Sequence, residues 1–209
     1  MNPALDLMLQ KARYHSLPRD VIDKALKKGA GKIEGQELQE VHYEAYGPAG
    51  SALYIKAITS NTNRSASNIR ALVVRMGGTM AEPGAVSRQF NQKGVIMING
   101  KIKKEVVKGN DITSVIPYDL NELEDDLMSL DIEDFQEEAG QCRIVTSFEA
   151  FTTVKKALDE KWYSIADADL QYLPQNELTL SDEDLASFQQ LYEALEEDED
   201  VDSIYHNVA

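Results

Sequence analysis

The spacing of apolar residues between positions 40 and 98 changes from a strand period to a helix period and back. Residues 40–60 alternate around a Gly-Pro turn, which is typical of a β-hairpin. Residues 63–76 repeat apolar side chains at helical spacing, and two short strands are expected at 85–90 and 94–98. This β-β-α-β-β order predicts an α+β fold with helices on one face of a sheet.

The same mixture of elements is expected before and after this region. Two helices are predicted at the start, one over 4–14 and one from Ser16 to Gly29, closed by a glycine-rich loop near residue 36. After residue 109 the pattern predicts helices near 120–130, at 148–160 and at 182–195, and strands at 142–147, 167–174 and 201–207. Ser181 with Asp184 is expected to cap the last of these helices.

The charges of the chain are distributed very unevenly. The formal net charge is −15, yet residues 1–108 hold 17 Lys and Arg against nine Asp and Glu, whereas residues 109–209 hold four against 27. Such a split suggests that the first half meets a polyanion and that the second half is solvated or orients the encounter by repulsion. A merely solubilising surface explains the acidic half equally well.

The side chains that usually carry enzyme chemistry show no catalytic pattern. His15, His42 and His206 lie in different predicted elements, Cys142 has no partner nearby in sequence, and hydrolase, nucleotide-loop and zinc motifs are absent. The acidic runs lack the glycine and the ligand spacing of a calcium loop. We therefore expect no catalytic residues, cofactor, metal or small-molecule substrate.

The apolar runs and the single cysteine bear on the compartment. No apolar run is long enough to cross a bilayer, and the first residues lack the basic-then-apolar layout of a signal peptide. One cysteine cannot form an internal disulfide, which suits a reducing compartment. The sequence therefore predicts a soluble, cytoplasmic protein without a membrane partner.

A cationic helix stands out in this acidic protein. Residues 58–78 contain three arginines and no acid, and residues 61–108 contain nine basic and two acidic side chains. Clustering of this kind is typical of a surface that follows a nucleic-acid backbone. The candidate phosphate contacts are Arg64, Arg70, Arg75, Arg88, Lys93, Lys101, Lys103 and Lys104, and Asn61 and Asn63 are candidates for a base or sugar edge. The alternative is a set of ordinary surface cations, some of them paired with acids of the other half.

Four aromatic residues have a structural and a functional interpretation. Tyr43, Tyr46 and Tyr54 flank the hairpin turn, where they could stack on bases as in single-strand binders. Tyrosines in strands are more often half-buried packing with a wet hydroxyl group, and this is the favoured interpretation. Trp162 is expected in a core or at a domain contact.

Several stretches together resemble one family of proteins. They are LPRDVIDKALKKGAG (17–31), YEAYGPAGSAL (43–53), TSNTNRSASNIRALVVRMGGTMAEPGAVSRQF (59–90), KGVI (93–96), LPQNELTL (173–180) and DVDSIYHN (200–207). Each stretch is modest by itself, but their order and spacing resemble, essentially from end to end, the bacterial YebC/PmpR family. The related mitochondrial translational activators of cytochrome oxidase share the resemblance.

This resemblance implies a fold and a function. The fold is a small helical domain followed by two ferredoxin-like α+β domains, one of them inserted into the other. On that plan the shortened helical domain is 1–36, the first α+β domain is 37–108 with 176–209, and the second, acidic one is 109–175. Family members are described as DNA-binding transcriptional regulators, some as factors acting on translation at the ribosome, and none as an enzyme.

The sequence also departs from the family pattern. Members usually begin with a further basic segment before the residues that here follow Met1, and its absence from this chain implies weaker phosphate contact. A DNRNR-like stretch is here SNTNR (60–64), GPGG is GPAG (47–50), and GSV is GAV (84–86). These changes trim polar or flexible groups, so they bear on base recognition more than on the fold.

The leading hypothesis is a non-enzymatic regulator of transcription that binds DNA. Two alternatives stay open. One is a translation factor that contacts RNA on the ribosome. The other is a protein-interaction module in which the acidic half recruits a basic partner and the cationic helix is only surface.

Overall fold

The computed structural model describes residues 38–107 and 110–209, together with eight single positions before residue 27. Those eight positions are helical; the remaining residues of the predicted helical domain 1–36, its closing loop and His15 lie outside the described residues. From residue 38 on, the chain forms two compact units. Residues 38–91 with 172–209 make up the split unit, and residues 92–171 make up the inserted unit.

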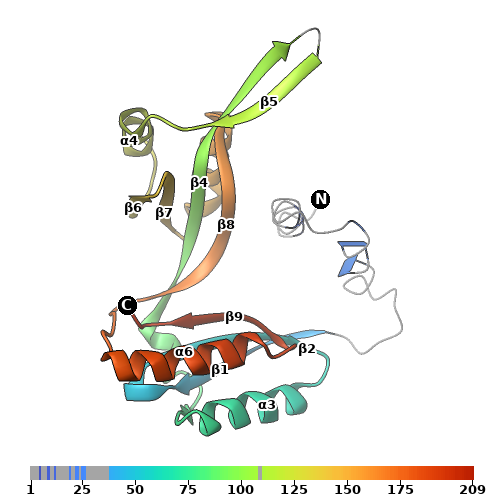
Figure 1. Ribbon diagram of the computed structural model, residues 1–209, viewed down its shortest axis with the longest axis vertical. Helices are drawn as coiled ribbons and strands as arrows, with labels where there is room; N and C mark the ends of the chain where they lie inside the picture. The colour runs from blue at the N-terminus through green and yellow to red at the C-terminus, as the bar shows by residue number, and fades with distance from the viewer. Residues whose placement is uncertain are drawn as a thin grey trace. The chain divides into compact units, whose positions relative to one another are not determined.

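The split unit is a four-stranded sheet with two helices on one face (Figure 1). The strands are β1 (Gln39–Tyr46), β2 (Ala52–Thr59), β3 (Thr79–Met80) and β9 (Val201–His206), and the helices are α3 (Thr62–Arg75) and α6 (Asp182–Glu196). The strand order is β3-β1-β2-β9, and all neighbours are antiparallel. Two short 3-10 turns, η1 (Pro48–Gly50) and η2 (Ser87–Gln89), complete the unit.

The central strand β2 is buried on both of its faces. Leu53 and Ile55 share a core with residues of α3 and α6, including Ile69 and Leu191, and all four are fully buried. Tyr54, one position out of phase, packs on the opposite face of the sheet in a second cluster with other aromatic side chains. Each large apolar side chain buried in this way contributes about 1.5–3 kcal/mol. Burial on both faces explains why β2 has a continuous apolar run rather than strict alternation.

Two local features of the split unit are the cap of α6 and the turn at Ala49. The hydroxyl group of Ser181 accepts a hydrogen bond from the backbone N–H of Asp184 at 3.2 Å and donates one to the Asp184 carboxylate at 2.6 Å, which confirms the predicted cap of α6. Ala49, where the family pattern has glycine, has φ = 53°. Glycine adopts this left-handed conformation without the steric cost that alanine incurs, so this departure strains the turn.

The inserted unit has a second antiparallel sheet covered by α4 (Leu120–Met128) and α5 (Phe151–Glu160). Its strands are β4 (Phe90–Val107), β5 (Asn110–Ile116), β6 (Asp134–Glu138), β7 (Gln141–Ser147) and β8 (Tyr163–Pro174). The order is β5-β4-β7-β6, and β8 pairs with β4. Ile96 and Ile144 of the sheet meet Leu123 of α4 and Leu158 of α5 in one buried core.

The α+β class is confirmed, and several local expectations are corrected. Of the stretch 85–90, expected as a strand, only Phe90 lies in one; residues 85–86 form a turn and Ser87–Gln89 a 3-10 turn. The backbone N–H groups of Val86 and Ser87 bond to a side chain instead of a sheet. The pattern does not predict β3, which has two residues, or β6, which is polar. It also does not predict β5, although the sequence NDITSVI contains three β-branched apolar residues. In the structure residues 92–107 group with the inserted unit. The expected domain plan, with 37–108 in the first α+β domain, stays a prediction.

Candidate nucleic-acid interface

Helix α3 presents an exposed face without any acidic side chain. Asn61 caps its start by accepting a hydrogen bond from the backbone N–H of Arg64 at 3.1 Å, so this amide is used inside the protein rather than held out to a ligand. Ser65, Ile69 and Val73 bury the inner side of the helix. The small or polar residues Asn63, Ser67, Asn68 and Ala71 are exposed on the outer side.

Arg70 and Arg75 flank this outer face. Both side chains are exposed, and neither forms an ion pair with a described carboxylate. On a helical wheel Arg70 lies on one side of the exposed stripe and Arg75 on the other. The α3 face, defined here as Asn63, Ser67, Arg70, Ala71 and Arg75, is therefore a strip of mostly small side chains between two guanidinium groups that no described carboxylate holds. The exposed Val74 also projects from the middle of this strip.

Arg64 is held by an acid from the far end of the chain. Its Nη2 atom donates to both carboxylate oxygens of Asp200, at 2.9 and 3.1 Å. The Asp200 side chain is 9% exposed, whereas that of Arg64 is 53% exposed. The Asp200 backbone also accepts from the N–H of Ile58 at 2.8 Å, so the pair joins α3 to the sheet edge. One nitrogen of the Arg64 guanidinium group is thus used within the protein, while about half of the side chain remains exposed.

The four candidate lysines all lie on β4, in the inserted unit, and three of them meet a carboxylate. Lys93 pairs with Glu133 at 2.6 Å, Lys101 pairs with Glu122, and Lys103 pairs with Glu105. The ammonium group of Lys104 lies 4.1 Å from the centre of the Trp162 ring. Trp162 is 50% exposed with φ = 64°, so the expectation of a core position for it is wrong.

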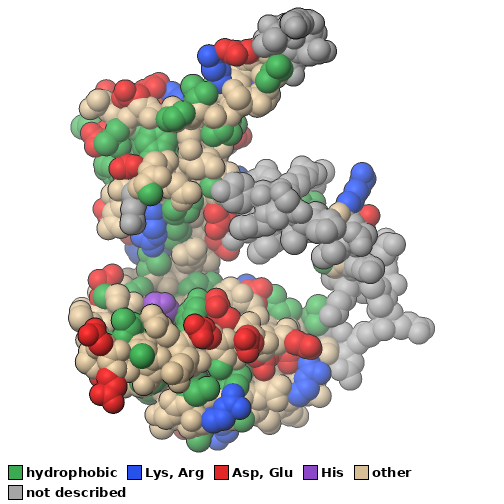
Figure 2. Space-filling model, viewed as in Figure 1, with side chains coloured by type: hydrophobic (Ala, Val, Ile, Leu, Met, Phe, Trp, Pro, Cys, Tyr) green, Lys and Arg blue, Asp and Glu red, His purple; other side chains and the backbone are tan. Residues whose placement is uncertain are grey.

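The two units therefore hold the candidate cations differently. In Figure 2, Lys and Arg side chains of the split unit show over α3, and Asp and Glu side chains show over α6. In the inserted unit three of the four candidate lysines pair with a carboxylate, and two of these acids, Glu122 and Glu133, belong to the second half of the chain. Arg70, Arg75 and Arg88 are the members of the predicted set without a carboxylate partner in the split unit.

Arg88 follows a loop that is anchored by the half-buried carboxylate of Glu44. The Glu44 side chain accepts hydrogen bonds from the backbone N–H groups of Gly84, Val86 and Ser87 at 2.7, 2.6 and 2.9 Å. Arg88 follows directly and donates from Nε to the carbonyl oxygen of Gly84 at 2.6 Å. The sequence offered no signal for this anchor, because Glu44 lies about 40 residues before its partners.

We expect replacement of Glu44 by glutamine to lower the free energy of unfolding by about 1–2 kcal/mol at pH 7, because a neutral amide is the weaker acceptor. Burial by itself would raise the pKa of Glu44, but the backbone hydrogen bonds outweigh it and hold the pKa below 4.5. The contribution is therefore fully present above pH 4.5 and is lost as the pH falls through the lower folded value. Urea denaturation of both proteins at pH 7 and at pH 3 measures it, and a difference that does not shrink at pH 3 would contradict the anchor.

The tyrosines that flank the hairpin turn have structural partners within the protein. Tyr43 donates to the carbonyl oxygen of Thr62 at 3.1 Å, and Tyr46 donates to that of Ala85 at 3.3 Å. Tyr54 is 9% exposed, and burial raises its pKa to about 12. The structural interpretation of these residues is therefore the one that the geometry favours.

The described histidines and the cysteine have separate packing partners. His42 stacks on Tyr54 with ring centres 5.0 Å apart, and His206 packs against Phe188 and Tyr192. Burial raises the pKa of the Cys142 thiol to about 11. Within residues 38–107 and 110–209, no three metal-ligating side chains gather as a metal site requires. None of the described helices is long and apolar enough to cross a membrane.

The two units together match one known family of proteins. A family model described as "TACO1/YebC second and third domain" matches residues 38–208. The chain belongs to the TACO1/YebC family. This confirms the resemblance inferred from the sequence stretches. The matched region covers both the split and the inserted unit, so the α3 face and the acidic inserted unit both lie within the part shared with the TACO1/YebC family.

Individual relatives of this TACO1/YebC chain support the assignment. A "Probable transcriptional regulatory protein TTE1135" from Caldanaerobacter subterraneus is 36% identical over 207 residues, covering 99% of this chain and 79% of the relative. A probable transcriptional regulatory protein from Kosmotoga olearia is 38% identical over 208 residues, covering 99% and 76%. The crystal structure of a conserved hypothetical protein, Aq1575 from Aquifex aeolicus, is similar with a TM-score of 0.82 and 29% identity, covering 100% of this chain and 80% of that one.

Proposed function

We propose that this protein is a non-enzymatic regulator of transcription that binds duplex DNA through the α3 face. The exposed, acid-free surface between Arg70 and Arg75 is the observation that carries the proposal. The names of the relatives, probable transcriptional regulatory proteins, support the regulatory role. The packed histidines and the buried cysteine are in keeping with binding rather than catalysis.

The dimensions of α3 suit a DNA groove. A helix of 14 residues is about 21 Å long, and the major groove of B-DNA is about 12 Å wide and admits one α-helix. Small residues along the centre of the α3 face would let the helix approach the base edges. Arg70 and Arg75 would then reach phosphates on opposite sides of the groove, with Asn63 near a base or sugar edge.

The acids beside α3 would restrict how DNA approaches. Helix α6 packs next to α3 and begins with three acids, Asp182, Glu183 and Asp184. Asp200 is already neutralised by Arg64. Repulsion of phosphates from α6 would favour contact through α3 alone, so the negative net charge orients the encounter instead of preventing it.

The dependence of binding on salt tests this proposal against its alternatives. Each phosphate contact adds about 0.9 to the slope of log affinity against log salt on duplex DNA. Two contacts, from Arg70 and Arg75, predict a slope of about −1.8. Arg88 is not counted, because its neighbours Val86 and Phe90 pack on the sheet face opposite α3. The measurement is a salt titration of binding to duplex DNA, single-stranded RNA and ribosomes in parallel.

The outcomes of that titration are distinct. Preference for duplex DNA with the predicted slope supports the proposal. Preference for RNA or ribosomes would replace DNA by RNA as the target and make the protein a translation factor. A slope near zero on all three would reject nucleic-acid binding by the α3 face.

A further inference from the structure

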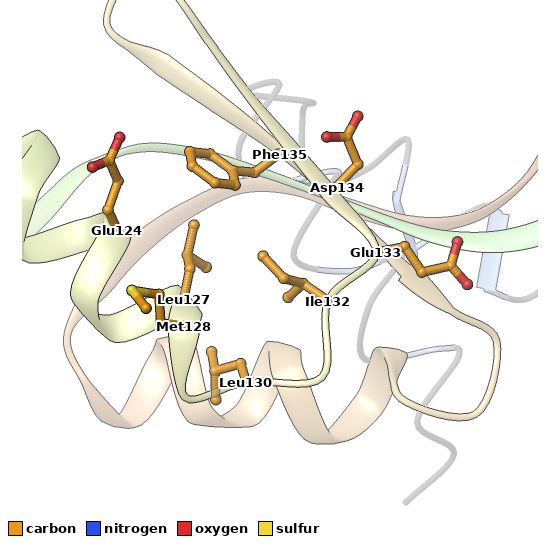
Figure 3. Close-up of a pocket in the computed structure, with 8 residues that line it drawn as sticks. All are labelled: Glu124, Leu127, Met128, Leu130, Ile132, Glu133, Asp134 and Phe135. Carbon is orange, nitrogen blue, oxygen red and sulfur yellow. The ribbon is translucent and has the colours of Figure 1, made fainter.

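An apolar groove with an acidic rim lies in the inserted unit, whereas the α3 face belongs to the split unit. It is formed by the end of α4, the loop after it and the first residues of β6 (Figure 3), with a volume of about 550 Å³. Its lining residues are Glu124, Leu127, Met128, Leu130, Ile132, Glu133, Asp134 and Phe135. The five apolar side chains make the floor, and the three acids stand around it.

The floor leaves apolar surface in contact with water. Leu127 is 1% exposed and joins the core, while Leu130, Ile132 and Phe135 are half-buried. Met128 is 85% exposed at the edge of the groove. A side chain so exposed contributes little to folding, and methionine adapts readily to the shape of a bound partner. An exposed patch in a concave site is typical of an interaction surface.

The rim carries negative charge that the protein itself does not compensate. Glu133 pairs with Lys93 at 2.6 Å, but Glu124 and Asp134 form no ion pair with a described cation. Asp125, next to Glu124 on α4, is exposed and likewise unpaired among the described residues. A positively charged partner could form ion pairs with these carboxylates without breaking an existing ion pair.

The strand that borders the groove is an edge strand. Strand β6 pairs with β7 on one side, and no other described strand pairs with it on its other side. An open strand edge offers backbone N–H and C=O groups to an extended peptide, and flanking pockets then select its side chains. Asp134 and Phe135 belong both to this strand and to the groove.

We propose that this groove binds an extended segment of a partner protein in which basic and apolar residues alternate. The segment adds to the open edge of β6, its apolar side chains enter the floor between Met128 and Phe135, and its lysine or arginine side chains meet Glu124 and Asp134. Alternation is required because successive side chains of a strand point to opposite sides. The site is independent of the proposed DNA contact, because it lies in the other unit.

The test uses the full chain and a labelled peptide of seven residues that alternates lysine and valine. Fluorescence anisotropy should show saturable binding. A control peptide of the same composition, with its lysines in one block, should bind at least about tenfold more weakly, because it cannot place charge and apolar groups on the proper sides. Hydrogen exchange at residues 134–138 should slow when the alternating peptide is bound.

Variants of exposed residues separate the groove from general acidity. The variant Glu124→Gln with Asp134→Asn should weaken binding of the alternating peptide about five- to tenfold. Met128→Ala should weaken it about threefold or more, and since Met128 is exposed the fold should be unaffected. A matched control, Glu193→Gln with Glu197→Gln at the exposed end of α6, removes the same charge and should change affinity less than twofold.

Four results would overturn the proposal. Equal binding of both peptides, or equal loss in the groove and control variants, would mean attraction by net charge alone. No saturable binding of the alternating peptide would mean that the groove is not a strand-addition site. Dimerisation in sedimentation experiments that Met128→Ala abolishes would show that a second copy of the chain occupies the groove.

Discussion

Replacing Arg70 and Arg75 together by glutamate is expected to weaken binding to duplex DNA by at least about thirtyfold at 0.15 M salt. Two lost phosphate contacts reduce the salt slope by about 1.8, and this corresponds to such a factor between 1 M and 0.15 M salt. The two new carboxylates add repulsion to that loss. Both arginines are exposed and have no carboxylate partner among the described residues, so the fold should tolerate the change. Electrophoretic mobility shifts across salt measure both the affinity and the slope.

A control variant with the same change in net charge tests whether the loss of affinity is specific to α3. Lys155→Glu with Lys156→Glu changes two cations on α5, in the inserted unit, and alters the net charge by the same amount. This control should lower DNA affinity only by the modest effect of net charge. If both double variants lose affinity equally, the α3 face is not the contact surface and general electrostatics accounts for the binding.

The second large effect concerns stability. We expect Arg64→Met to lower the free energy of unfolding by about 2–3 kcal/mol, because the Asp200 carboxylate, which is 9% exposed, loses its charged partner. The value is set below that of a fully buried pair because water reaches half of the Arg64 side chain. Arg75→Met removes a guanidinium group that holds no carboxylate and should change stability by less than about 0.5 kcal/mol. Urea denaturation at pH 7 compares the two.

A double-mutant cycle isolates the ion pair from other effects of the substitutions. Combining Arg64→Met with Asp200→Asn should cost less than the sum of the single changes, with a coupling of about 1–2 kcal/mol. DNA affinity of folded Arg64→Met should stay within about twofold of the wild type. If Arg64→Met instead leaves the free energy of unfolding unchanged and loses DNA affinity, Arg64 is a phosphate contact.

Together these variants divide the predicted cations into two groups with different physical roles. Arg64 and Lys93 each meet an acid of the second half at 2.9 and 2.6 Å, so their charge is used in holding the fold. Arg70 and Arg75 keep their charge available for a ligand. If phosphate binding depends on the second group alone, the protein needs few contacts, and its affinity should be more sensitive to single changes than that of a protein with a broad basic surface.

Local elements could be predicted from the sequence where the signal spans neighbouring residues. The inner stripe of α3, with Ile69 and Val73 buried, follows from apolar spacing, and the Ser181 cap follows from two residues three positions apart. Strand β6 could not be predicted in this way, since its sequence DFQEE has one apolar residue and becomes a strand only by pairing with β7. The groove beside β6 therefore could not be predicted from the sequence either.

The sequence by itself determined the α+β class, the family, the helical stripe of α3 and the unequal charge of the two halves. The class, the helical stripe and the charge depend on composition or on residues close to one another in sequence, and the family depends on the order and spacing of short stretches along the chain. The tertiary structure alone decided which cations remain available, because the partner of Arg64 lies 136 residues away and that of Lys93 lies 40 residues away. Ion pairing acts over a few ångströms in space, so a contact between residues so far apart along the chain exists only once the sheets and helices have packed.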